Sequence, residues 1–429
     1  MNESEFEAAV GMSRKWDAQE AGREVARDTI NKLKRPPSFF LLFSTIHYEK
    51  HGGFEEFLKG VWDVLPKETP LVGGTVAGFI NTQGCYTRGA TALAVSCPDM
   101  ELTIGIGKNT KRTPHLAGKK CAKMIKNNVE KTKFKNTCII DIISGPSVPS
   151  IPFVGSKRVI KSKIMGGFLK QGLLYSSYIM QRGFGREEEV LTSFGEKLQD
   201  YPIVGFSTSD DNNLRTNYSF LNNMIVKNCI LALSISSDIN FDINGGHGFC
   251  PSSNTLKITN SDLWGYMIKE IDGIPALKKF LEVSGWTNET VDDEQFYRKS
   301  FFYPVGFKDE KGEFHPATIG AIWGNNLVCG CSIPGEEIVV LSSSGRKMVN
   351  VVEELLSTMP RDPLLGLFFS CAIRLEALGH NIYHSQKILN NFFNGIPYLL
   401  VFGFGENRAI PSTRPANYNV TLQSLVFSR

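Results

Sequence analysis

Two residues near the C-terminus place a nucleophile beside a cation. Cys371 closes the apolar run 364–370, and Arg374 follows three residues later. A thiol at the start of a helix, one turn from a guanidinium, is expected to have a depressed pKa. With a base such as His247 it would be an acyl-transfer nucleophile. The alternative is that Cys371 is a small core residue, a common role for a cysteine at the end of an apolar strand.

Acidic and small polar residues follow other apolar runs. Asp210 and Asp211 come after the run 203–206, and Glu406 comes after the run 398–403. The same strand ends supply further groups for contact with a ligand: Gly73, Gly74, Thr75, Ser207, Thr208, Gly405 and Asn419. A structural role is the alternative in each case. The aspartates would cap a turn, Glu406 would form a buried ion pair with the nearby arginine, and the glycines would allow close packing or a positive φ.

These strand ends belong to a unit that the chain repeats three times: a strand, a helix, a second strand, a polar turn region and a third strand. The strands are predicted at 39–45, 70–78 and 90–95, then at 138–145, 201–211 and 230–235, and finally at 364–371, 396–406 and 420–427. A short polar connector would let the third strand pair with the second. This predicts an α/β (α+β) protein of two domains, with mixed sheets flanked by helices in an αββα layering. Ligands of such sheets bind at strand ends, so we expect the site there.

The segments between the repeats complete the expected architecture. The apolar spacing over 18–34 predicts a helix packed on the first sheet. The insertion at 147–185 predicts a loop and a helix that cover the site. A polar stretch at 285–300 has no apolar period and predicts a linker. Beyond it, 301–341 predicts short antiparallel strands with a hairpin turn at 309–312.

Composition limits the functional classes. The 429 residues suffice for two domains, and a net charge of +4 gives no reason to expect nucleic-acid binding. The basic run at 108–135 is interpreted as a solvated helix face and not as a phosphate or membrane contact. The sequence contains no run of about 18 apolar residues and no signal peptide, so we expect a cytoplasmic protein without membrane insertion. Nine cysteines without a paired framework predict reduced thiols.

Two pairs of residues have the spacing of metal ligands, but neither pair has the further ligands that a site needs. Cys329 and Cys331 lack a second pair of ligands. His380 and His384 lie one helical turn apart, but no third ligand stands nearby. We therefore expect neither a metal nor an organic cofactor.

Several motifs follow one another in an order that points to a family. The first half contains the segments 70–75 and 77–78, then Gly205-x-Ser207-x-x-Asp210, 246–248 and 272–276; the second half contains 303–304, 333–336, 369–374, 396–397, 403–407 and Asn419-x-Thr421. In this order the chain resembles the FIST sensory proteins. The resemblance implies a helical lead-in at 1–35, a FIST N domain at 36–285 and a FIST C domain at 286–429. Phe79 stands where the family usually has an acid, and Phe404 stands where it has a tyrosine.

The resemblance implies ligand sensing in signal transduction, with amino acids or related metabolites as ligands. For a zwitterion, Arg374 would bind the carboxylate, and Glu406 or the two aspartates would bind the ammonium group. We expect the signal to pass to a separate output protein, because no kinase, cyclase, methyl-accepting or DNA-binding segment is recognised. Two other functions stay open: a hydrolase or amidase that depends on Cys371, and a protein-binding scaffold without a ligand.

Overall fold

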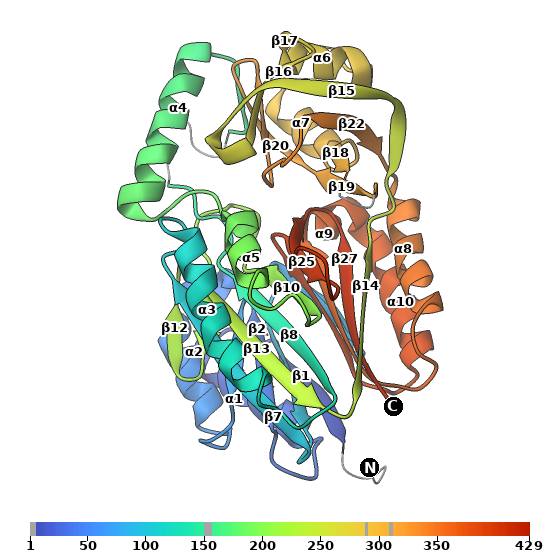
Figure 1. Cartoon of the computed structure of the whole chain (residues 1–429). Coiled ribbons are helices and arrows are strands. Elements are labelled where there is room, and N and C mark those ends of the chain that lie inside the picture. Colours follow the sequence, from blue (N-terminus) through green and yellow to red (C-terminus); the bar gives the residue numbers. More distant parts are fainter. Residues whose placement is uncertain (1–5, 150–156, 288–290, 309–311) are drawn as a thin grey trace.

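The strands of the three repeats are buried on both faces, which explains why they read as continuous apolar runs. The computed structural model describes residues 6–149, 157–287, 291–308 and 312–429 (Figure 1). The first strands of the repeats are β2 (Phe39–Ser44), β8 (Asn136–Ile143) and β23 (Pro363–Cys371). Each pairs in parallel with the second strand of its repeat: β3 (Leu71–Thr75), β10 (Ile203–Ser207) and β24 (Tyr398–Gly403). Each pair lies in a sheet of its own, and the mixed sheets expected from the sequence are confirmed.

The third strand of each repeat pairs with the first strand and not with the second. These strands are β6 (Ala90–Ser96), β13 (Cys229–Ser237) and β27 (Leu422–Ser428), all antiparallel to their partners. The predicted pairing with the second strand was therefore wrong. An outer strand completes this side of each sheet: β1 (Glu7–Ser13), β7 (Met100–Lys108) and β14 (Asn240–Gly246). The N-terminal lead-in thus contains a strand before its helix.

A hairpin from another repeat occupies the place beside each second strand, and this explains the wrong prediction. The hairpin of β4 (Gly78–Asn81) and β5 (Gly84–Tyr86) pairs with β24. The hairpin of β11 (Ser219–Leu221) and β12 (Met224–Val226) pairs with β3. The hairpin of β25 (Glu406–Ala409) and β26 (Ala416–Tyr418) pairs with β10. The three repeats exchange hairpins in a cycle, so each sheet needs two repeats.

The three sheets share one apolar core and carry helices on their outer faces. Phe206 lies between Phe43 and Phe369 in this core, with ring centroids 5.7 and 5.4 Å away, so each repeat contributes one ring. The helices are α1 (Ala18–Ile30) and α2 (Gly53–Trp62) on the first sheet, α3 (Pro114–Val129) and α5 (Glu187–Gly195) on the second, and α8 (Gly345–Ser357), α9 (Ala372–Leu378) and α10 (Ile382–Phe393) on the third. Short helical turns lie at η1 (Ile46–Lys50) and η5 (Gly379–Asn381). The helix predicted at 18–34 is present as α1, and we call the three sheets with these helices the core body.

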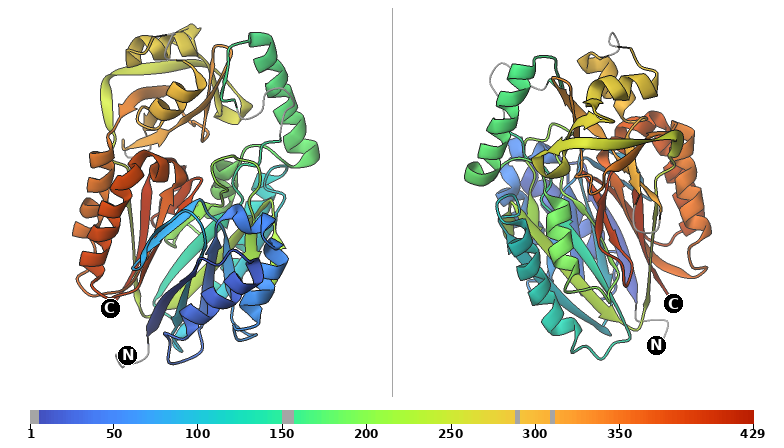
Figure 2. Two further views of the ribbon diagram at one scale, coloured as in Figure 1. Left: turned by 180° about the vertical axis from the view of Figure 1, so that it is seen from behind. Right: turned by 45° about the horizontal axis from the view of Figure 1, so that its top comes forward.

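A fourth sheet forms a cap over the ends of the core strands (Figure 2). Its strands are β15 (Cys250–Asp262), β16 (Met267–Ile271), β17 (Ile274–Pro275), β18 (Val305–Lys308), β19 (Phe314–Ala317), β20 (Ile319–Trp323), β21 (Asn326–Cys329), β22 (Glu337–Ser342) and β9 (Val159–Ile160). Helices α6 (Ala276–Ser284) and α7 (Asp293–Ser300) and the turn η3 (Leu263–Gly265) complete the cap. The stretch 293–300, predicted as linker, is helical. In the predicted hairpin turn, 309–311 lie outside the described residues, but the flanking strands β18 and β19 do pair.

The insertion predicted to cover the site contains a helix at the side of the cap. Helix α4 (Lys163–Tyr175) follows β9 and continues into the π-helical turn η2 (Ser176–Met180). The Ser162 side chain caps α4 by accepting the amide of Met165. In the described part of the chain, no helix has the length and apolar character needed to span a bilayer.

Candidate functional site

The ends of the second strands meet, and a ring of backbone hydrogen bonds joins them. The bonds run from the amide of Ala77 to the carbonyl of Phe402, from that of Ser209 to Thr75, and from that of Phe404 to Ser207, at 2.8–2.9 Å. Thr75, Ser207 and Thr208 are completely buried as a result. The strand ends of the three repeats therefore come together as expected, but they fill the space between themselves. Room for a ligand lies above them, in the loops.

A cavity of about 400 Å³ lies above the strand ends of the second and third repeats, between the core body and the cap. Phe404 and Ile373 form its floor, and Trp323 of β20 lies on the cap side. Leu169 and Leu173 of α4 close another side. The insertion thus covers this cavity, and its role as a cover of the ligand site stays a prediction. We call this space the strand-end cavity.

Charged groups line the strand-end cavity on the side of the loop 210–216. The guanidinium of Arg158 donates to the carbonyl of Asn212 at 3.4 Å, and that of Arg215 donates to the carbonyl of Val148 at 3.4 Å. Lys157 and Asp211 also line the cavity. Three cations and one carboxylate make this wall net positive, which favours an anionic group on a bound molecule.

Asp210 and Asp211 have different roles. The Asp210 carboxylate accepts the amides of Leu214, Arg215 and Thr216 at 3.0, 2.6 and 3.3 Å. Burial raises the Asp210 pKa, and these three hydrogen bonds oppose that shift. Asp210 therefore shapes the loop, as the structural alternative proposed, whereas exposed Asp211 faces the cavity.

The loop 210–216 also borders a second hollow of about 390 Å³ over the strand ends of the first repeat. Thr45, His47 and Arg88 line it together with Asp210 and Asp211. Burial, with the nearby cation of Arg88, lowers the His47 pKa to about 4. The two hollows thus share one wall.

The remaining small residues singled out in the sequence support the cavity from behind. The Thr208 hydroxyl donates to the side chain of Asn217 at 2.8 Å, and Asn217 holds the carbonyls of Gly145 and Pro146 at 3.1 and 2.9 Å. Asn419 is buried and accepts from the hydroxyl of Thr318, which lines the cavity.

The three glycines singled out with them fill positions where no side chain fits. A Cβ on Gly73 would lie 1.7 Å from the Leu42 carbonyl oxygen, and one on Gly74 would lie 2.5 Å from Thr208. A Cβ on Gly405 would lie 2.6 Å from the side chain of Asn417. Close packing, the alternative raised for these glycines, accounts for their positions.

Arg374 and Glu406 lie outside the cavity lining, in a closed polar cluster. Arg374 is 1 % exposed, and its Nη2 donates to the Met348 carbonyl at 2.7 Å. Glu406 Oε2 accepts the amide and the hydroxyl of Thr421 at 3.1 and 2.9 Å. Nε and Nη1 of the arginine and Oε1 of the glutamate have no hydrogen-bond partner among the described residues. No ion pair within 4 Å joins Arg374 to Glu406. Burial lowers the pKa of Arg374 to about 10, and the nearby carboxylate of Glu406 opposes that shift.

Cys371 is sealed in the same cluster. Burial raises the pKa of its thiol well above the usual value, and the carboxylate of Glu406 adds to that shift. The predicted depression of the thiol pKa is therefore contradicted, because desolvation outweighs the effect of Arg374 and of the helix start. His247 accepts the amide of Phe249 at 3.0 Å through Nδ1, and burial lowers its pKa to about 4. The described residues contain no group of three or more His, Cys, Asp or Glu side chains able to hold a metal ion.

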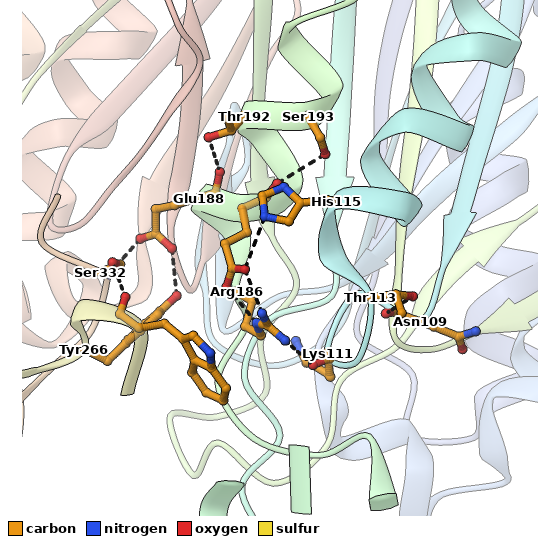
Figure 3. A network of polar contacts seen from close by, with 12 residues as sticks. Asn109, Lys111, Thr113, His115, Arg186, Glu188, Thr192, Ser193, Tyr266 and Ser332 are labelled. Atoms are coloured by element: carbon orange, nitrogen blue, oxygen red, sulfur yellow. Dashed lines mark hydrogen bonds and ion pairs between the residues drawn. The ribbon is translucent and has the colours of Figure 1, made fainter. Parts of the chain in front are cut away.

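A polar network fastens the cap to α5 beside the strand-end cavity (Figure 3). The Tyr266 hydroxyl donates to Glu188 at 2.7 Å, and the same carboxylate accepts the amide of Ser332 at 2.9 Å. The guanidinium of Arg186 lies 4.5 Å from the Trp264 ring centroid. Burial, reinforced by a neighbouring carboxylate, raises the Glu188 pKa to about 8. This network fixes the distance between core body and cap on one side of the cavity.

Comparison with known proteins identifies the domains. The FIST N domain profile matches residues 38–274, and the FIST C domain profile matches residues 276–407. An uncharacterized protein of Methanocaldococcus jannaschii, MJ1623, is 28% identical over 403 residues, which are 88% of this chain and 68% of that protein.

Solved structures are only distantly similar. A cyanuric acid hydrolase from A. caulinodans has a TM-score of 0.28 and 7% identity over 55% of this chain and 72% of its own. The PurLQS complex of Thermotoga maritima has a TM-score of 0.20 and 10% identity over 99% of this chain and 72% of its own. These scores are too low to support a shared fold.

Proposed function

We propose that this chain, which belongs to the FIST family, senses a small amphiphilic metabolite in the strand-end cavity. FIST domains are associated with sensory signal transduction. Amino acids and related metabolites are the proposed ligand class, and a separate protein is the proposed recipient of the signal. The domain limits 36–285 and 286–429 and a cytoplasmic location remain predictions.

The strand-end cavity is the observation that carries this proposal. Its volume of about 400 Å³ lies within the range of about 300–1,000 Å³ typical of small-molecule sites. Apolar side chains from the core body, the cap and α4 surround a few charged groups, as in most such sites. A cavity closed by a helix of an insertion also offers a way to convert binding into movement.

The charges on the cavity wall suggest how a zwitterion would bind. Arg158 and Arg215 would attract a ligand carboxylate through the positive charge that they place on this wall. Asp211 would bind the ammonium group. Arg374, which the sequence suggested as the partner of the ligand carboxylate, lies outside the cavity lining. Arg158 and Arg215 would bind the carboxylate in its place. The apolar side chain of the ligand would pack against Leu169 and Leu173.

A thermal-shift screen against amino acids, small amides and nucleotides tests the proposal. A ligand at about one hundred times its Kd stabilises the folded state by about 2.7 kcal/mol. Arg215→Gln removes a charge-assisted contact worth about 1.5–3 kcal/mol, so Kd should rise roughly 10- to 150-fold. Asp211→Asn should weaken only ligands that carry an ammonium group.

Arg361→Gln is the matched control for these variants. Arg361 is exposed in the turn before β23, at the end of that strand remote from Cys371, and its replacement should leave Kd unchanged. If no compound shifts the melting temperature of the wild type, a protein-binding scaffold without a ligand becomes the favoured function. If a compound binds equally well to wild type and Arg215→Gln, the ligand lies elsewhere. The hydrolase alternative has lost its main support, because burial raises the pKa of the Cys371 thiol.

A further inference from the structure

We propose that the outer face of α4 and η2 binds the surface of an anionic membrane. This proposal does not rest on the one made for the strand-end cavity, since different side chains carry the two contacts. We call this outer face the α4 face; it consists of Ile164, Met165, Phe168, Tyr175, Tyr178, Ile179 and Met180.

Exposed apolar surface is concentrated on the α4 face. Among the described residues, thirteen large apolar side chains are exposed, and these seven are among them. Ile164, Phe168, Tyr175 and Ile179 are 76, 70, 63 and 61% exposed. Their spacing of four, seven and four residues places them along one side of the helix. Only Gly166, Leu169 and Leu173 of α4 are buried, so the helix rests on the body through a narrow stripe.

The charge of the segment favours a lipid surface over a protein partner. Residues 157–186 contain seven Lys or Arg residues and no Asp or Glu, and two of the seven, Lys170 and Arg186, form ion pairs with acids outside this segment. Lys161 and Lys163 are exposed at the start of α4. A helix that combines large apolar side chains on one side with flanking cations is typical of segments that lie in the headgroup region of anionic bilayers. Such a helix lies on the membrane and does not cross it.

Helix α3, on the same side of the molecule in Figures 1 and 2, extends this character. It exposes Leu116 and Met124 and the lysines Lys119, Lys120 and Lys123.

Two glycines weaken helix α4 itself. Open space surrounds the positions of Gly167 and Gly172, and glycine weakens a helix that is not otherwise supported. Adsorption to a bilayer would supply the missing apolar contacts.

Co-sedimentation of the full chain with vesicles tests the proposal. One set contains phosphatidylcholine alone, and the other contains phosphatidylcholine with about 30% phosphatidylserine, at low and high salt. We expect binding to the second set only, weakened by salt because the lysines act through screened charge. Each lysine near an anionic surface contributes about a fivefold change in affinity, so Lys161→Gln with Lys163→Gln should weaken binding roughly thirtyfold.

Phe168→Ser and Tyr383→Ser form a matched pair of aromatic substitutions. Tyr383 is 60% exposed and belongs to α10, a helix on the opposite side of the molecule from α4 in Figure 1. Phe168→Ser should weaken vesicle binding at least roughly tenfold, and Tyr383→Ser should leave it unchanged. Equal melting temperatures would show that both variants are folded.

Three results would overturn the proposal. The first is failure of the wild type to bind anionic vesicles. The second is binding that neither Phe168→Ser nor the lysine pair reduces, since another face would then carry it. The third is a dimer in solution that Phe168→Ser dissociates while vesicle binding is absent, since the α4 face would then join two copies of this chain.

Discussion

Replacing Arg374 by methionine tests whether the closed cluster around Glu406 is structural. Both side chains are fully buried, and each charge affects the pKa of the other. Replacing Arg374 removes its buried hydrogen bond to the Met348 carbonyl, and a hydrogen bond from a charged group contributes about 1.5–3 kcal/mol. An unfolding entropy of about 2.1 cal/mol/K per residue over 429 residues amounts to about 0.9 kcal/mol/K. Arg374→Met should therefore lower the melting temperature by about 2–3 °C if the chain melts as one unit.

The penalty should depend on pH in a definite direction. Burial raises the pKa of Glu406 in the folded state above its value in the unfolded chain, and Arg374 opposes this shift. A group with a raised folded pKa contributes stability that is present below the unfolded pKa and lost as the pH rises towards the folded pKa. Without Arg374 the folded pKa rises further, so the loss extends to higher pH. The destabilisation by Arg374→Met should be no smaller at pH 8 than at pH 5, and it should grow once the pH passes the folded-state pKa that Glu406 has in the wild type.

A double-mutant cycle with Glu406→Gln, followed by calorimetry at both pH values, measures the coupling. The double variant should be more stable than the sum of the two single changes predicts, because neither charge is left alone. Additive effects, or a loss of less than 1 °C for Arg374→Met, would refute this account. So would a variant that keeps its stability and loses the ligand, since Arg374 would then be the clamp expected from the sequence.

Three further substitutions and one chemical reagent probe the packing. Gly73→Ala should lower the free energy of unfolding by about 3 kcal/mol or more, because the new Cβ would lie 1.7 Å from a carbonyl oxygen of β2. Gly167→Ala, in open space on α4, should leave the stability unchanged or raise it by up to about 1 kcal/mol. Melting curves of the two variants test this difference. A disulfide reagent should modify exposed Cys250 quickly and buried Cys371 only on unfolding; rapid labelling of Cys371 in the folded protein would contradict its burial. Tyr266→Phe should lower the urea midpoint by the equivalent of about 0.5–1.5 kcal/mol at neutral pH, since it removes the hydrogen bond to the part-buried side chain of Glu188. An unchanged midpoint would mean that the network does not hold the cap.

The repeats could be predicted because their strands are buried on both faces. The run 39–44 and its counterparts are apolar without alternation, and the polar residues after them mark the strand ends. The hairpin exchange could not be predicted. Pairing between β4 and β24 joins residues more than three hundred positions apart, and no local pattern selects one open sheet edge over another. The short connector before β6 suggested the nearest partner, whereas the exchanged hairpin occupies that place.

The sequence indicated where the candidate site would lie, but not which charged side chains would line it. The strand ends, the cover at 147–185 and Asp211 all border the strand-end cavity. Arg374 and Glu406 have the residue types of a ligand clamp, but the same types also occur in closed polar clusters. Only the packing distinguishes the two cases, and here it places both residues outside the cavity lining. Arg158 and Arg215 lie in irregular loops without apolar spacing. The one signal for Arg215 was its place five residues after Asp210, in a turn too long to be a simple connector.

Helix α4 has two faces with different proposed contacts, and this links the two proposals. Leu169 and Leu173 line the strand-end cavity, whereas Ile164 and Phe168 point outwards. If ligand binding shifts α4, the affinity for vesicles must change, and vesicles must change the affinity for the ligand by the same factor. We expect a factor of roughly 5–150, the usual range of such coupling. Calorimetric titration of a compound identified in the thermal-shift screen, with and without phosphatidylserine vesicles, measures it. Identical ligand affinities in both titrations would mean that α4 does not move, and the cavity and the α4 face would then act separately.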